Sequence, residues 1–147
     1  MFDADFFARP AHLISRAARM MSRLGDEVLK PYGFSVGQLP VLGMLSDGEA
    51  LPQKTLALRA QIEQPSMAQM LNRMERDGLI HRTPDPADKR SHLISLTDTA
   101  SGRLPGMLAD IKRGGEDALA GLSAEEVATL THLLHKVIAN LEAISAD

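Results

Sequence analysis

The sequence contains no cysteine. Without this residue the chain cannot form disulfide bonds, thiolate metal sites or thiol-based redox sensors. We therefore expect its stability to come from the burial of apolar side chains. A cysteine-free composition fits a reducing cytoplasm and does not fit an oxidised, disulfide-bonded secreted scaffold.

Long apolar runs are also missing. No stretch approaches the roughly 20 residues that a helix needs to cross a bilayer. The segment from Met1 to Arg9 carries Asp3 and Asp5, and it lacks the basic start and apolar centre of a signal peptide. We therefore expect a soluble, cytoplasmic protein with no membrane partner. With 147 residues, of which 44% are hydrophobic, the chain is long enough for one globular domain over residues 1–147.

Motifs for catalysis and cofactor binding are lacking as well. No glycine-rich phosphate loop of the Walker or Rossmann type occurs. Asp85, Asp88 and His92 have no accompanying nucleophile or oxyanion motif, and they fit a turn better than an acid–base group. The sequence predicts no enzyme activity and no cofactor.

A metal site is the one alternative that the sequence leaves open to the prediction of no cofactor. His132 and His135 lie three residues apart and could share a metal on one face of a helix. No dense carboxylate or cysteine cluster completes a ligand set, so we expect no metal and interpret the two histidines as an ordinary pair.

Positive charge is concentrated in the middle of the sequence. The formal net charge is -3, yet residues 53–92 carry seven basic and five acidic residues. The ends are acidic in comparison. Because Lys and Arg supply most of the affinity for phosphates, a basic centre between acidic ends is typical of a DNA-contacting module flanked by helices that do not touch DNA.

Long amphipathic helices are predicted at both ends of the chain. Apolar residues recur at spacings of three and four over residues 10–30, which predicts the first helix. A capping box formed by Ser123 and Glu126 begins the last helix. The helix before it contains Gly114 and Gly115, where we expect a kink or a break.

The apolar stripes of these end helices need a partner. The central module is small and largely covers itself, so we expect residues 1–34 and 104–147 to form the dimerisation helices of a two-fold homodimer. The alternative is a monomer in which the end helices fold back onto their own central module.

The central segment, residues 35–103, has the pattern of a winged helix-turn-helix. Ser35 and Gln38 form a capping box before a short helix that contains Pro40. Residues 53–59 predict another short helix, and a second one follows after a tight link, with a glycine as its C-cap at position 78. Two helices joined by so short a link indicate a helix-turn-helix.

A β-hairpin follows the second of these helices. Residues 79–83 and 92–96 predict two short strands, and the prolines and aspartates of residues 84–90 favour a turn between them. This hairpin is the predicted wing. Thr97, directly after it, can cap the next helix. The predicted fold class is therefore mainly α, with a small β-hairpin wing.

In a helix-turn-helix the second helix lies in the major groove of DNA. Gln and Asn can bind adenine with two hydrogen bonds, Arg can bind guanine or phosphate, and Ser suits either a base or the backbone. The alternative is that these polar residues merely solvate an exposed helix face. The predicted DNA-contacting residues of this helix are Gln64, Pro65, Ser66, Gln69, Asn72 and Arg73.

The wing supplies two further candidates. Lys89 and Arg90 lie at the predicted tip, from which they can reach an adjacent minor groove, and narrow minor grooves attract arginine. Asp88, two residues before Arg90, is expected to orient the guanidinium through a charge-assisted hydrogen bond. The alternative is an ordinary exposed turn with mixed charges.

These residues carry a family resemblance. Residues 53–103 closely resemble the MarR family of bacterial regulators, and the flanking helices resemble its dimerisation region. The wing and its exit match the family pattern D-x-R-x(5)-L-T, and the end of the second helix matches as well; the matching residues are Glu75, Gly78, Leu79, Asp88, Arg90, Leu96 and Thr97. One departure is Ala100, where the family usually has glycine, which puts the start of the following helix in doubt.

The resemblance implies a winged-helix homodimer that binds pseudo-palindromic operators, usually as a repressor, and that is often released by a small and frequently aromatic ligand. We place the ligand pocket at Phe34, Met44 and Leu45. Some members of the family bind zinc, which keeps the histidine pair open. The rival interpretation is a winged-helix protein-interaction module that does not bind DNA, which the overall acidity favours.

Overall fold

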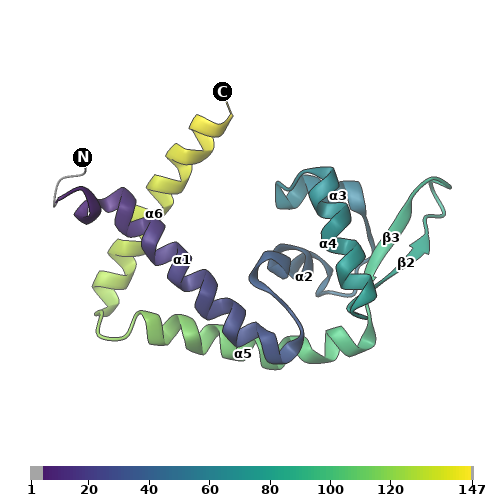
Figure 1. Ribbon diagram of the computed structural model, residues 1–147, viewed down its shortest axis with the longest axis horizontal. Coiled ribbons are helices and arrows are strands. Elements are labelled where there is room, and N and C mark those ends of the chain that lie inside the picture. The colour runs from purple at the N-terminus through teal and green to yellow at the C-terminus, as the bar shows by residue number, and fades with distance from the viewer. Residues whose placement is uncertain (1–4, 147) are drawn as a thin grey trace. The chain divides into compact units, whose positions relative to one another are not determined.

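The computed structural model describes residues 5–146, which form two compact units that divide between Lys112 and Arg113. Asp3, one of the two aspartates near the N-terminus, lies outside the described residues. The chain is mainly helical with a small β-hairpin, so the predicted fold class is confirmed (Figure 1). None of the helices within residues 5–146 has the length and apolar character needed to cross a membrane.

The first unit begins with the helices before the helix-turn-helix. A short 3-10 helix, Phe6–Ala8, precedes α1, Pro10–Leu29. Pro10 occupies the first turn of α1, where its missing N–H breaks no helical hydrogen bond. A second 3-10 helix, Lys30–Tyr32, follows. The Tyr32 hydroxyl donates to Asp110 Oδ2 at 2.6 Å, so the end of α1 is joined to helix α5, Asp98–Ala118.

Helix α2 spans Leu39–Leu45 and follows a 3-10 helix, Val36–Gln38. This extra turn explains how Pro40 is accommodated. Pro40 lies in the first turn of α2 rather than inside a longer helix, so no hydrogen bond is lost. The Gln38 side chain accepts from the Ser35 N–H at 3.0 Å, as the capping box predicts.

The helix-turn-helix consists of α3, Gln53–Ala60, and α4, Gln64–Arg76. In the link between them, Gln61 has a positive φ of 54°, a conformation that lets the chain turn sharply. Buried apolar side chains hold the two helices on the common core: Leu56, Ala57, Met67, Leu71 and Met74. Gly78, with φ of 72°, follows α4 as predicted, because a left-handed residue there favours glycine.

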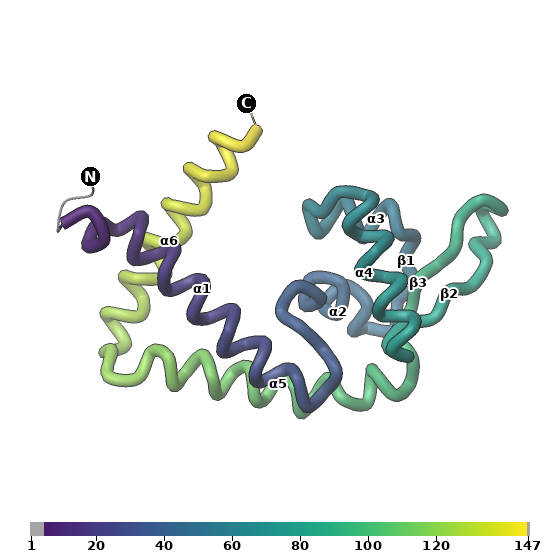
Figure 2. The backbone as a smooth tube through the Cα atoms, viewed as in Figure 1, coloured from purple at the N-terminus to yellow at the C-terminus, as the bar shows by residue number. Residues whose placement is uncertain are grey.

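The sheet has three antiparallel strands in the order β1-β3-β2. Strand β2 spans Ile80–Pro84 and β3 spans His92–Leu96, close to the predicted positions. Strand β1, Leu51–Pro52, was not predicted; it pairs with Leu93 and Ile94 on β3 (Figure 2). Two residues are too few to show an alternating pattern, so β1 has no signal in the sequence.

Helix α5 spans Asp98–Ala118 without interruption, so the predicted break at Gly114 and Gly115 is wrong. A glycine in a helix costs only about 1 kcal/mol relative to alanine, and the flanking turns offset this amount. The helix instead ends before a turn that contains Gly121, whose φ is 87°. Ala100 is fully buried in the first turn, so its presence in place of glycine does not displace the start of the helix.

Thr97 caps α5 as predicted. Its Oγ1 accepts from the Ala100 N–H at 3.2 Å and donates to the Gly78 carbonyl at 2.7 Å.

Thr97→Val removes the hydroxyl and keeps the shape of the side chain, so we expect the free energy of unfolding to fall by about 1 kcal/mol. Thr97→Ser keeps the hydroxyl and should lose less. Urea denaturation measures both; equal stability of the valine variant and the natural protein would contradict the cap.

The second unit contains α6, Ala124–Ser145. Its predicted capping box is confirmed: the Ser123 N–H donates to Glu126 at 2.8 Å, and the Glu126 N–H donates to Ser123 Oγ at 3.1 Å. No residue of α6 is buried, although the helix is rich in leucine, isoleucine and valine, which usually pack against a partner. The exposed apolar side chains of α6 are Leu130, Leu133, Ile138, Leu141 and Ile144.

Candidate nucleic-acid interface

Helix α4 buries one face and exposes the other. Met67, Leu71 and Met74 are fully buried in the core, at the three- and four-residue spacing of one helix face. The opposite face is polar and open to solvent. All the predicted DNA-contacting residues of α4 are exposed, namely Gln64, Pro65, Ser66, Gln69, Asn72 and Arg73.

The beginning of α4 is joined to the beginning of α3 by a side-chain hydrogen bond. Gln53 Nε2 donates to Gln64 Oε1 at 3.2 Å. The amide oxygen of Gln64 is therefore oriented by its neighbour before any DNA is present. Gln53 was not among the predicted site residues, because the pairing of two glutamines eleven positions apart has no signature in the sequence.

A second link joins α4 to the wing through Arg82 of β2. Arg82 Nη1 donates to Glu75 Oε1 at 2.8 Å, and Arg82 Nη2 donates to Asn72 Oδ1 at 3.0 Å. Both acceptors lie on α4, three residues apart and therefore on neighbouring turns. The structure thus places Asn72 in a hydrogen-bonded group with Arg82, a residue that sequence reasoning missed.

The wing tip is built from two aspartates that cap its turns. Asp85 Oδ1 accepts from the Ala87 N–H at 2.8 Å, and Asp88 Oδ1 accepts from the Arg90 N–H at 2.9 Å. Such side-chain to backbone bonds two residues ahead are typical of aspartate in turns. The hairpin that carries this tip extends away from α3 and α4 (Figure 1).

This contact differs from the one expected for Asp88. The carboxylate holds the backbone N–H of Arg90, whereas we predicted a hydrogen bond to the guanidinium. The local reason is geometric, because an aspartate two residues before an N–H reaches that group without ordering a long side chain. Lys89 and Arg90 are both exposed, and within residues 5–146 no ion pair engages either of them.

Another arginine at the end of α4 has a fixed partner. Arg76 Nε donates to Asp77 Oδ1 at 2.9 Å. This hydrogen bond raises the pKa of Arg76 and lowers the pKa of Asp77 from their usual values. Both groups are fully charged at neutral pH, so the positive charge of Arg76 on the exposed face is partly offset by its neighbour.

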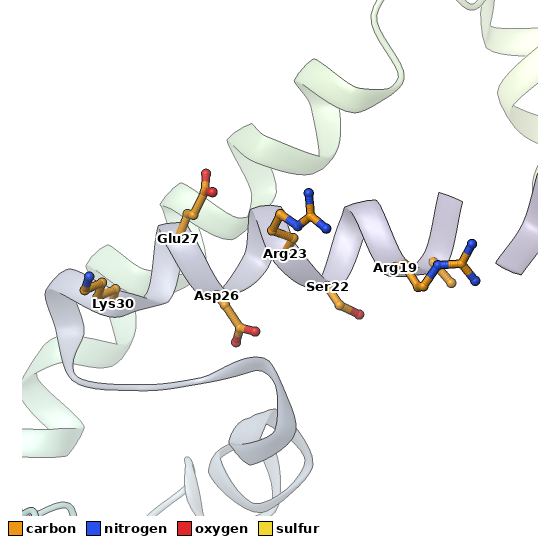
Figure 3. A pocket seen from close by; sticks show the side chains of 7 residues that line it. Arg19, Ser22, Arg23, Asp26, Glu27 and Lys30 are labelled. Carbon is orange, nitrogen blue, oxygen red and sulfur yellow. The ribbon is translucent and has the colours of Figure 1, made fainter. Parts of the chain in front are cut away.

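The residues of the predicted ligand pocket do not surround a described hollow. Phe34 and Leu45 belong to the buried core, and Met44 packs against it. One hollow of about 680 Å³ lies along α1 and is lined by residues of α1, Arg19 and Arg23 among them, and by Lys30 of the 3-10 helix that follows (Figure 3). It is open to solvent. None of the three predicted pocket residues lines this hollow, so the ligand pocket at Phe34, Met44 and Leu45 stays a prediction.

Polar contacts also explain the orientation of one side chain in this hollow. Asp26 Oδ1 accepts from the Val36 N–H at 2.8 Å, which joins α1 to the segment before α2. Figure 3 shows Asp26 directed toward that segment, while Arg23 and Glu27 point to the other side of α1.

Among the described residues no group of three His, Asp or Glu is placed to hold a metal, so His132 and His135 have no third ligand.

The sequence matches a known family over the central module. Residues 32–91 match a family model described as the MarR family. The chain is 32% identical over 112 residues to the homoprotocatechuate degradative operon repressor of Escherichia coli. This match covers 76% of the chain and 76% of the relative.

The fold matches solved structures of regulators over most of the chain. The transcriptional regulator PcaV from Streptomyces coelicolor aligns with a TM-score of 0.81 and 27% identity, covering 92% of this chain and 98% of PcaV. A cysteine-to-serine variant of MarR from E. coli, complexed with operator DNA, aligns with a TM-score of 0.79 and 27% identity. That match covers 92% of this chain and 99% of MarR.

Proposed function

The chain belongs to the MarR family of transcriptional regulators, and on this premise we propose that it binds a pseudo-palindromic DNA operator as a homodimer and represses transcription. The exposed face of α4 enters the major groove, and the wing tip reaches the minor groove beside it. Because a chromosomal operator lies in the cytoplasm of a bacterium, we also propose that the protein acts there. We propose no enzymatic activity for it.

The observation that carries this proposal is that two exposed polar surfaces belong to elements that pack on the same hydrophobic core. One surface is the exposed face of α4, which includes Gln69. The other is the wing tip, with the cations Lys89 and Arg90. Arg82 bridges these elements directly. The MarR complex with operator DNA, which has the same fold, supports DNA as the partner of this surface.

The apolar side chains of α6 support the homodimer. Ile138, Leu141 and Ile144 are exposed in a single chain, as are Leu13 and Met20 of α1. Exposed apolar stripes of this kind mark interfaces in soluble proteins. A two-fold dimer would present two α4 helices, with half-site centres about 10 base pairs apart.

Release by a small molecule is also part of the proposal. Its support is the PcaV structure in complex with its natural ligand, which aligns with a TM-score of 0.76 and 27% identity over 95% of this chain and 98% of PcaV. An aromatic ligand is the class that we expect. Phe34 and Leu45 would contact it only after a rearrangement of the core, since both are buried.

A titration of labelled duplex DNA tests the central claim. We expect fluorescence anisotropy to rise at low salt and binding to weaken steeply as salt increases, because phosphate contacts release counterions. Selection from a random duplex library should return a motif with two related half-sites. Absence of binding at low salt would contradict the proposal and favour the protein-interaction alternative.

Gln69→Ala should relax the selected motif. Gln69 is exposed on α4 and can bind a base edge with two hydrogen bonds, so its loss should reduce discrimination at one position of each half-site by about tenfold. The comparison is between motifs selected by the variant and by the natural protein. If both proteins select the same motif, Gln69 does not read a base.

A further inference from the structure

The side-chain amide of Asn72 has one end occupied. Arg82 Nη2 lies 3.0 Å from Asn72 Oδ1. An amide oxygen and nitrogen are easily interchanged, but here the assignment follows from chemistry, because a guanidinium has only donors and can face only the oxygen. The oxygen keeps a second lone pair but faces the Arg82 cation, whereas the NH2 end has no hydrogen-bond partner among the described residues and is the end that remains for DNA.

Arg82 is itself held in place from a second direction. Its other terminal nitrogen donates to Glu75 at 2.8 Å, and the Arg82 side chain is only 21% exposed. A guanidinium is planar and rigid, so a fork that bonds two acceptors fixes both of them relative to each other. The orientation of Asn72 is thus set by β2 and by α4 together.

Asn72 also lies where α4 would meet a duplex. Gln69 precedes it by three residues and Arg76 follows it by four, which places the three side chains on one face of the helix. All three are exposed. The fixed amide therefore belongs to the surface that is proposed to enter the major groove.

We propose that Arg82 sets the base preference of α4 by fixing the Asn72 amide with its NH2 group toward the duplex. This inference rests on the proposed DNA-binding function. A free asparagine amide pairs with adenine, using its oxygen as acceptor and its nitrogen as donor. With the oxygen on Arg82, Asn72 acts as a donor and favours guanine, which presents two acceptors, N7 and O6, or thymine, which presents O4, over adenine, whose single acceptor N7 lies beside the N6 donor.

This conclusion revises the adenine pairing that the residue type alone suggests for Asn72. Arg82 is a positioning residue here, since it acts on the DNA through another side chain. A purely structural role of Arg82 would change affinity for all duplexes alike. A positioning role changes which base is preferred at one position, and that difference is measurable.

Motif selection with four proteins tests the inference. Asn72→Ala first identifies the operator position that depends on this residue, as the position whose preference disappears. The natural protein should prefer guanine or thymine there. Arg82→Met keeps an unbranched stem but frees the amide, so adenine should gain about tenfold relative to guanine at that position. The double variant Asn72→Ala, Arg82→Met should show no preference.

A second variant keeps the test valid if Arg82→Met does not fold. Asn72→Asp is an exposed change that retains an oxygen for Arg82 and replaces the NH2 group with an acceptor. We expect the preference to move to cytosine, whose N4 donates. Unchanged motifs for Arg82→Met and Asn72→Asp would overturn the inference and leave the proposed function intact. A natural protein that selects no motif would overturn the proposed function, and this inference with it.

Discussion

Replacing Arg90 with alanine is expected to weaken operator binding by about tenfold or more and to flatten its salt dependence. Arg90 is exposed at the wing tip, and its backbone N–H, rather than its guanidinium, is bonded to Asp88. The guanidinium is therefore available to DNA without first breaking an internal ion pair. Each lost phosphate contact should reduce the slope of log affinity against log salt by about 0.9.

Anisotropy titrations at several salt concentrations measure both effects. Arg19→Ala is the matched control, because it removes one exposed arginine from α1, outside the predicted DNA-binding module. It should leave affinity and slope nearly unchanged. If Arg90→Ala behaves like Arg19→Ala, the wing tip does not enter the minor groove, and α4 alone carries the interface.

The second large effect concerns the core beneath the interface. Leu71 lies on the buried face of α4 and is 0% exposed. Leu71→Ala should lower the free energy of unfolding by about 3 kcal/mol, because it removes buried apolar surface and leaves a cavity. Since the same helix presents Gln69 and Asn72, operator affinity should fall with stability.

Leu58→Ala provides the control, because Leu58 on α3 is 77% exposed. The same chemical change there should cost less than about 0.5 kcal/mol. Urea denaturation at one protein concentration compares the two variants, which removes the effect of subunit association. Equal losses would mean that Leu71 is not part of the packed core.

Residues that act locally were the ones that the sequence predicted well. Thr97 and the Ser123–Glu126 capping box signal helix starts through bonds that span three residues, and the structure contains them. The apolar spacing of α4 likewise predicted which of its faces is exposed. These features depend on short-range geometry, which a single sequence records.

Features that depend on distant partners were missed. Strand β1 exists because Leu51 and Pro52 pair with β3, more than forty positions away. The role of Arg82 depends on two acceptors on another element. Asp88 accepts from the backbone N–H of Arg90 rather than from its guanidinium, since the sequence does not show whether a carboxylate faces a backbone N–H or a side chain.

The short strand β1 also restricts how the interface can move. It ends at Pro52, and α3 begins at Gln53, so no residue separates strand from helix. β1 is hydrogen-bonded to β3, and β3 to β2, which carries the wing. A reorientation of α3 would therefore pull on the wing through the sheet. An effector that tilts the helices would change the spacing of both DNA contacts in a single step, without needing a separate hinge in the hairpin.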